Sequence, residues 1–271
     1  MKENKTNPKI SIISDEISQD FKTAVEIGFS WGINNYEIRG INYKRIPDIL
    51  DSELSLIKDV IKTYKIKIVA ISPGIFKIPW EERKIEEHLK ERLPKSFELA
   101  RKLGTKSIII FTPIRDRKCP LDFSKMINFI KEASEAAEKE GFILALENEP
   151  ICYADTGRNT AYIIKKVDSL ALKINWDPAN AFSSGEIPYP DGYRNIKNYI
   201  FHLHIKDARR IKGEGVQYLP VGEGEINWKD QISALKKDKY QGYFSIETHF
   251  SPRVESTRKC LANLHSLLGR I

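Results

Sequence analysis

The stretch FILALENEPICYADTGRNTAYIIKKVDSLALKINWDPAN, residues 142–180, contains one complete strand–helix–strand unit. The runs FILALEN (142–148) and LKINWDP (172–178) are short and mainly apolar, which is typical of buried strands. Between them, TAYIIKKV (160–167) has the amphipathic pattern of a helix. Two strands joined through a helix are expected to lie parallel in one sheet, so this unit predicts a fold of the α/β class.

The same alternation of strand and helix runs through the rest of the chain. Further strands are predicted at residues 9–16, 34–40, 67–74, 107–114, 201–207 and 243–249. Further helices are predicted at residues 21–29, 52–64, 82–104, 123–141, 228–240 and 253–271. Eight strands in alternation, without a long polar linker, predict a single (β/α)8 TIM barrel domain over residues 1–271, a usual length for that fold.

Three local features qualify this pattern. Pro94 lies inside the predicted helix at 82–104 and is expected to kink or split it. Two long segments, 183–195 and 208–227, are expected to be irregular. Both should lie over the carboxyl-terminal rim of the barrel, where long loops are more often functional than accidental.

The composition sets limits on partners and location. The formal net charge is +7, but the Lys and Arg residues are scattered along helices, which favours a solvated surface over a nucleic-acid partner. The amino terminus MKENKTNPKI has no apolar core, and no later stretch approaches 18 apolar residues, so no membrane partner is expected. Cys119, Cys152 and Cys260 are far apart and form no C-x-x-C pair, which fits a reduced, cytoplasmic protein.

Polar residues terminate the last four predicted strands. They are Glu147, Asp177, His204 and Glu247. The carboxyl-terminal ends of all barrel strands meet at the rim where such folds keep their chemistry. We therefore expect these four side chains to converge.

The residues two positions earlier support an inward orientation, because side chains two apart on a strand share one face. These residues are Ala145, Asn175, His202 and Ser245. They are small or polar, and two of them, Asn175 and His202, are expected to support the ligands from below. His204 is nearer to the strand end than His202, so we predict His204 as the rim residue.

Three buried carboxylates in one place favour a bound cation. Each would cost several kcal/mol without a positive partner, although a salt bridge to Lys or Arg is the alternative for any one of them. Three carboxylates with one imidazole make an oxygen-rich site that suits one divalent ion: Mn, Mg or Co, with Zn as a further option. Three carboxylates around a divalent ion leave a net charge of about −1. A basic neighbour is therefore expected among Lys206, Arg209 and Arg210.

Five motifs in order resemble the xylose isomerase-like barrel superfamily, in its sugar phosphate isomerase/epimerase branch. They are ALENEP (145–150), NWDPANAF (175–182), HLHIKD (202–207), VGEGEINW (221–228) and FSIETHF (244–250). The resemblance implies a single-metal site with the ligands Glu147, Asp177, His204 and Glu247. It also implies that the two glutamates act as the acid/base pair.

The resemblance further suggests contacts with substrate. Arg210 matches an arginine that touches substrate oxygens, and Glu37 resembles a rim carboxylate that binds a hydroxyl. A salt bridge between Glu37 and Arg39, or a lysine, is the alternative. Asn180, which stands where many relatives have a second histidine, and His202 complete the predicted substrate-binding set.

The predicted activity is isomerisation or epimerisation of a small ketose-like sugar, sugar phosphate or sugar acid. A metal would chelate a carbonyl and its neighbouring hydroxyl and stabilise an enediolate, while one glutamate takes a proton and the other returns it. The partner is then a small carbohydrate, and a homodimer is an option, since relatives often associate as dimers. Glu223 and Glu225 in the GEGEIN loop would repel a phosphate, so a structural role for this loop is favoured.

Three other functions compete with this one. An inosose dehydratase-like lyase would begin with the same proton abstraction and lose water. An endonuclease IV-like phosphodiesterase would need three metals, but Val216 and Tyr218 stand where that enzyme has an Asp and a His ligand. A non-catalytic sugar-binding barrel has no evident use for two acid/base carboxylates.

Overall fold

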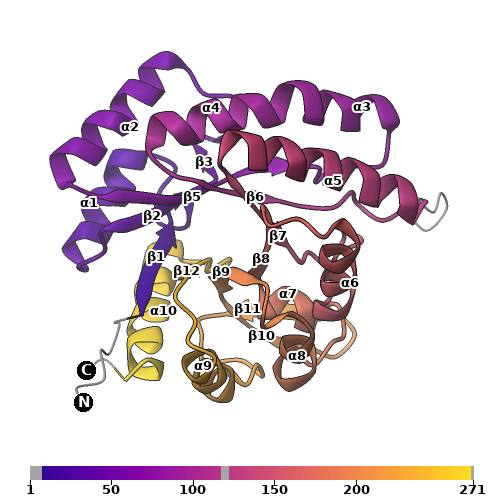
Figure 1. Cartoon of the computed structure of the whole chain (residues 1–271). Helices are drawn as coiled ribbons and strands as arrows, with labels where there is room; N and C mark the ends of the chain where they lie inside the picture. Colours follow the sequence, from indigo (N-terminus) through magenta and orange to yellow (C-terminus); the bar gives the residue numbers. More distant parts are fainter. Residues whose placement is uncertain (1–7, 117–121, 270–271) are drawn as a thin grey trace, which may run out of the picture.

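The computed structural model describes residues 8–116 and 122–269, and its centre is a closed barrel of parallel strands (Figure 1). In spatial order the strands are β1 (Lys9–Ile13), β12 (Tyr243–Ile246), β9 (Ile200–Ile205), β8 (Leu172–Trp176), β7 (Ile143–Glu147), β6 (Ser107–Ile110), β5 (Lys67–Ile75) and β2 (Asn35–Ile38). The predicted (β/α)8 barrel is confirmed. All eight predicted strands contribute to it.

Helices surround the barrel on its outside (Figure 1). They are α1 (Phe21–Ser30), α2 (Asp51–Tyr64), α3 (Glu82–Glu87), α4 (Leu93–Leu103), α5 (Phe123–Glu140), α6 (Gly157–Val167), α7 (Pro178–Ser183), α8 (Tyr193–Ile196), α9 (Trp228–Lys237) and α10 (Arg253–Leu267). A π-helical turn at His88–Arg92 separates α3 from α4, so the predicted helix at 82–104 is split just before Pro94. In the described ranges, no helix has the length and apolarity needed to cross a membrane.

Alternation along the strands divides the core into two layers. Residues that face outward, such as Ile12, Leu146 and Leu203, join the large core under the helices. Inside the barrel, β5, β6 and β7 supply a small apolar cluster that includes Ala70, Ile109 and Ala145. The interior positions of the remaining strands are polar: Ser11, Glu37, Asn175, His202 and Ser245. The polar half of the interior therefore lies beneath the rim that carries the predicted site.

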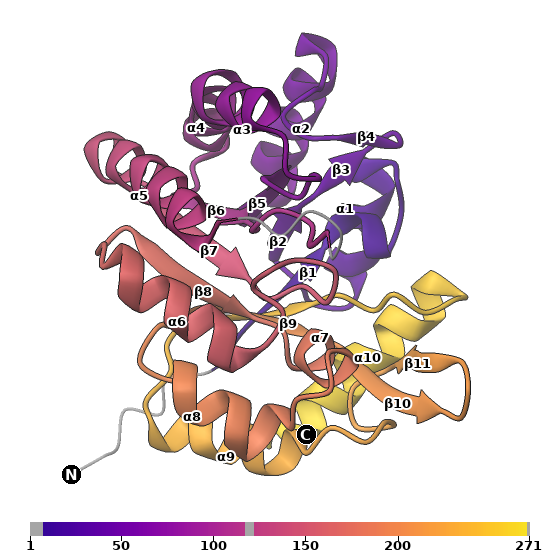
Figure 2. The ribbon, with the colours of Figure 1, turned by 90° about the vertical axis from the view of Figure 1, so that its right-hand side faces the viewer.

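The segment 208–227 is more regular than predicted. It contains most of an antiparallel hairpin formed by β10 (Asp207–Ile211) and β11 (Gly215–Leu219), which lies beside α7 (Figure 2). The buried carboxylate of Asp207 accepts hydrogen bonds from the backbone N–H of Gly222 at 2.8 Å and of Ile226 at 3.2 Å. These bonds hold the GEGEIN loop against the hairpin, which agrees with the structural role predicted for that loop.

The remaining short elements also differ from the prediction. The other predicted irregular segment, 183–195, contains a π-helical turn at Pro188–Gly192 and the start of α8. A second small hairpin pairs β3 (Gly40–Ile41) with β4 (Lys44–Arg45), and a 3-10 turn, Ser14–Glu16, follows β1. Cys152 and Cys260 are buried free thiols, whereas Cys119 lies outside the described residues.

Candidate metal centre

The four predicted ligands come together at the carboxyl-terminal rim of the barrel. Glu147 ends β7 and His204 lies on β9, while Asp177 and Glu247 directly follow β8 and β12. One candidate ligand atom from each residue lies within 4.8 Å of the others, and all four residues are buried. The strand ends bring them together in three dimensions as the sequence predicted.

His204 has two differently placed ring nitrogens. Its Nε2 lies 3.1 and 3.2 Å from the two carboxylate oxygens of Glu37, so it donates its proton to that carboxylate. Its Nδ1 lies 3.5 Å from Glu147 Oε2 and 3.3 Å from Glu247 Oε2, and has no hydrogen-bond partner among the described residues. An imidazole held by an outer carboxylate, with its other nitrogen facing acidic groups, is the usual arrangement of a metal-ligating histidine.

The carboxylates around His204 also favour a positive charge at this position. Burial by itself lowers the pKa of His204, but the carboxylates of Glu37, Glu147 and Glu247 outweigh burial and raise this pKa well above its usual value. The negative charge that raises this pKa would also stabilise a divalent cation bound to the imidazole.

Asp177 is oriented by the local sequence Asp-Pro-Ala-Asn. Its Oδ1 accepts hydrogen bonds from the backbone N–H of Ala179 at 2.9 Å and of Asn180 at 3.0 Å, so it caps α7. Pro178 occupies the first turn of that helix, where its missing N–H costs nothing. With Oδ1 engaged by the helix, Oδ2 faces the centre.

Lys206 is the basic neighbour that the charge sum required. Its side chain is 2% exposed, and its Nζ lies 2.7 Å from Asp177 Oδ2 and 2.7 Å from Glu247 Oε2. Burial raises the pKa of Asp177 more than Lys206 lowers it, which leaves it at about 6. Although burial also favours the neutral form of Glu247, Lys206 helps to hold its pKa well below the usual value. The other two candidates, Arg209 and Arg210, are exposed on the hairpin.

The second oxygen of Glu247 is held by Arg39. Arg39 Nη1 lies 2.7 Å from Glu247 Oε1, and its Nη2 lies 2.6 Å from Glu16 Oε1 and 3.0 Å from Asp15 Oδ1. His249 Nε2 lies 3.1 Å from the same oxygen of Glu247. The spacing of Glu16, Glu247 and His249 also suits a metal, but both glutamates already pair with the Arg39 guanidinium. The other oxygen of Glu247, Oε2, remains directed at His204 and Lys206.

Glu37 and His202 lie in the layer below His204. The Glu37 carboxylate is fully buried and accepts hydrogen bonds from His202 Nε2 at 3.0 Å and from Ser245 Oγ at 3.0 Å, in addition to His204. The predicted contacts of Glu37 and His202 with substrate stay predictions. Both residues position His204 from inside the barrel. The alternative of a Glu37–Arg39 salt bridge is wrong, because Arg39 pairs with Glu247 instead.

Two amides support Glu147. Asn175 Nδ2 donates to Glu147 Oε2 at 3.1 Å, as predicted, and Asn180 Nδ2 lies 3.4 Å from Glu147 Oε1. Asn180 is 2% exposed and also donates to the carbonyl of Asn148 at 2.9 Å. Its contact with substrate stays a prediction.

Arg210 lies apart from the four ligands, on the hairpin. Its guanidinium stacks 4.5 Å from the centre of the Phe182 ring and donates from Nη2 to the Phe182 carbonyl at 3.3 Å. These contacts direct the side chain toward α7. The predicted contact of Arg210 with substrate stays a prediction.

Three residues of the site were not predicted from the sequence. Asn148 exchanges two hydrogen bonds of 2.8 Å with the backbone of Asp177 and so joins the ends of β7 and β8. Tyr218 places its ring 5.1 Å from Lys206 Nζ. Arg39 is the third. Asn148 had a signal, since it directly follows Glu147 in the ALENEP motif, whereas Tyr218 lay in a segment expected to be irregular.

Comparison with known proteins identifies the family. A profile of the family described as xylose isomerase-like TIM barrel matches residues 21–266. The chain belongs to this family. An uncharacterized protein of Methanocaldococcus jannaschii is 32% identical over 122 residues, which are 44% of this chain and 41% of that protein.

Two relatives of known activity match most of the chain. The 3-dehydroshikimate dehydratase of Bacillus anthracis is 26% identical over 239 residues, covering 80% of this chain and 81% of the enzyme. The fructoselysine 3-epimerase of Escherichia coli O157:H7 is 21% identical over 247 residues, covering 85% of each protein. The family relatives with named activities thus include both epimerases and dehydratases.

Solved structures show the same fold. The probable 3-dehydroshikimate dehydratase AsbF of Bacillus anthracis superposes with a TM-score of 0.77 at 18% identity, covering 94% of this chain and 98% of that one. The IolI protein, solved with a zinc atom, superposes with a TM-score of 0.77 at 19% identity, covering 97% and 98%.

Proposed function

We propose that the protein is a metal-dependent isomerase or epimerase of a small ketose-like sugar, sugar phosphate or sugar acid. The main support is the placement of two glutamates around one point. Glu147 and Glu247 approach His204 Nδ1 to 3.5 and 3.3 Å from β7 and from the end of β12, which flank β8 and β9 in the barrel. The family relationship to a fructoselysine 3-epimerase agrees with this assignment.

The residues present fit a single divalent ion. Glu147, Asp177, His204 and Glu247 would hold it, and their three carboxylates and one imidazole suit Mn, Mg or Co, with Zn as a further option. When bound, such an ion supplies stabilisation for negative charge that develops on substrate oxygens. That the related fold of IolI was solved with zinc supports a metal at this rim.

The two glutamates would move the proton. One carboxylate removes a proton from the carbon beside the substrate carbonyl, and the other returns a proton to the opposite face of that carbon or to its neighbour. Asn175 and Asn180 hold Glu147, while Lys206 and Arg39 hold Glu247, so both carboxylates have fixed positions. Fixed positions are what proton transfer to a bound carbon acid requires.

A dehydratase is the second candidate. It is favoured by the 3-dehydroshikimate dehydratase of Bacillus anthracis, which covers 80% of this chain at 26% identity. The same carboxylate would remove the same kind of proton, and a hydroxyl on the next carbon would then leave as water. The two candidates differ in product mass, because isomerisation conserves mass and dehydration removes one water.

The test is metal-dependent exchange of solvent deuterium into a panel of ketoses and keto-sugar acids, followed by NMR and mass spectrometry. We expect exchange at one carbon with Mn²⁺, none after chelation, and none in Glu147→Gln or Glu247→Gln. Glu223→Gln is the matched control, because Glu223 pairs with Lys259 at 2.8 Å, outside the centre. Exchange that persists in both site variants would reject the proposed acid/base pair, and loss of water would make the protein a dehydratase.

A further inference from the structure

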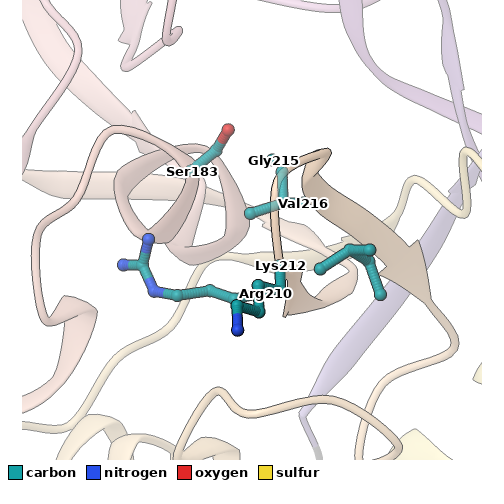
Figure 3. Close-up of a pocket in the computed structure, with 6 residues that line it drawn as sticks. Ser183, Arg210, Lys212, Gly215 and Val216 are labelled. Atoms are coloured by element: carbon teal, nitrogen blue, oxygen red, sulfur yellow. The ribbon is translucent and has the colours of Figure 1, made fainter.

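An open pocket of about 470 Å³ lies between α7 and the β10–β11 hairpin (Figure 3). It is lined by Ser183, Arg210, Ile211, Lys212, Gly215 and Val216. Two of these residues carry a positive charge and none carries a negative one. Figure 3 shows the Arg210 guanidinium lying below α7, with Gly215 and Val216 on the hairpin to its right.

The hairpin register places Arg210 on the face that turns toward the barrel mouth. Arg210 pairs with Val216 and Ala208 pairs with Tyr218 across the two strands, so these four side chains share one face. The contacts with Phe182, 4.5 Å to its ring and 3.3 Å to its carbonyl, hold the guanidinium in place. That carbonyl engages one nitrogen of a group with five N–H donors, so several donors remain for a ligand.

The positive charge of the pocket is not neutralised by the protein. Within residues 8–116 and 122–269, neither Arg210 nor Lys212 forms a salt bridge. Glu225 accepts a hydrogen bond from the backbone N–H of Arg210 at 2.8 Å and does not line the pocket. Glu223 is bound to Lys259 at 2.8 Å and to Asn263 at 3.0 Å. The repulsion of an anion by Glu223, expected from the sequence, is thereby weakened.

A short series of contacts connects the pocket to the candidate metal centre. Tyr218 lies on the same face of the hairpin as Arg210 and Val216, which line the pocket. The Tyr218 ring lies 5.1 Å from Lys206 Nζ, which in turn lies 2.7 Å from Asp177 and from Glu247. One aromatic ring thus separates the pocket from the residues around the proposed ion.

We infer that this pocket binds an anionic group of the substrate, a phosphate or a carboxylate, at the end remote from the reacting carbon. The inference rests on the proposed function and narrows its substrate class to anionic ketoses. A guanidinium and an ammonium that face one open space without acidic partners recognise such groups through charge-assisted hydrogen bonds. The acidic centre alone would not attract an anion, so a separate basic pocket supplies that attraction.

The first test measures binding without turnover. Glycerol 3-phosphate, glycerate and glycerol are titrated calorimetrically into the wild-type protein and into Arg210→Gln, Lys212→Gln and Arg209→Gln. Arg209 is the matched control, because its Nε donates to Gln217 on the other face of the hairpin at 2.9 Å. We expect an anionic probe to bind and glycerol not to bind, and each pocket variant to weaken binding about tenfold. The anionic probe that binds more tightly shows whether the pocket prefers a phosphate or a carboxylate.

The outcomes separate this inference from the proposed function. Equal weakening in Arg209→Gln, or no binding of either anion, would overturn the pocket assignment. Binding that depends on Arg210 and Lys212 supports the pocket even if no ketose exchanges its protons. Where turnover is found, Arg210→Gln and Lys212→Gln should raise KM for the anionic ketose about tenfold more than KM for the neutral ketose. An equal rise in KM for both ketoses would contradict the pocket assignment.

Discussion

Replacing Glu37 by glutamine should weaken metal binding, although Glu37 contacts no ion directly. Its Oε2 accepts from His202 at 3.0 Å, Ser245 at 3.0 Å and His204 at 3.1 Å, whereas its Oε1 accepts only from His204, at 3.2 Å. The single oxygen of glutamine fits best where three donors meet. Its NH₂ group then faces the Nε2 proton of His204, and two donors oppose each other.

The imidazole relieves this conflict by moving its proton to Nδ1, the nitrogen that faces Glu147 and Glu247. A protonated Nδ1 cannot ligate a metal. Loss of such an outer partner typically weakens metal affinity about 10–100-fold, or about 1.4–2.7 kcal/mol. The mismatched buried hydrogen bond should also lower the free energy of unfolding of the metal-free protein by about 1–3 kcal/mol.

The assay is calorimetric titration of Mn²⁺ or Co²⁺ into wild-type protein, Glu37→Gln and Ser245→Ala, with near-UV circular dichroism as a check of packing. Ser245→Ala removes one donor to Glu37 without disturbing His204, so its affinity should stay within about threefold of wild type. A similarly unchanged affinity in a well-packed Glu37→Gln variant would refute the reasoning. If KM alone rose, Glu37 would contact substrate after all.

Three further predictions concern stability. Asp177→Asn should retain the α7 cap, whereas Asp177→Ala should lose it. Urea unfolding should therefore find the alanine variant less stable than the asparagine variant by about 1 kcal/mol, and equal stabilities would contradict the capping role. Calorimetry should find weak metal binding in both variants. Lys206→Met leaves two buried carboxylates without their lysine and should destabilise the metal-free protein by about 3–5 kcal/mol. Mn²⁺ should then raise the melting temperature of this variant more than that of wild type. Equal increases would show that the lysine and the ion do not neutralise the same carboxylates. Burial lowers the pKa of His88, whose Nδ1 accepts from the Phe76 N–H at 2.9 Å, so the unfolded chain binds the proton more readily. The stability of wild type relative to His88→Asn should therefore fall as the pH drops below about 6.5; parallel stability curves between pH 5.5 and 7.5 would contradict this assignment.

The strand ends were readable from the sequence because they depend on local regularities. Apolar runs of strand length located the eight barrel strands, and the period of two put Glu147, Asp177 and His204 on the inner face. Parallel strands of a closed barrel end at one rim, so a one-dimensional pattern was enough to bring these residues together. The hairpin at 207–219 escaped notice because its exposed strands lack a continuous apolar run.

The partners of the site residues required the folded chain. Glu37 supports His204 from a strand that is not adjacent to β9, because β1 and β12 lie between them. Arg39 reaches Glu247 across 208 positions of sequence, and Lys206 turns its ammonium inward between two acids. Local periodicity says which face a side chain occupies. Which charges meet inside the barrel depends on how the strands are staggered and which rotamers the packing allows, and both are properties of the closed structure.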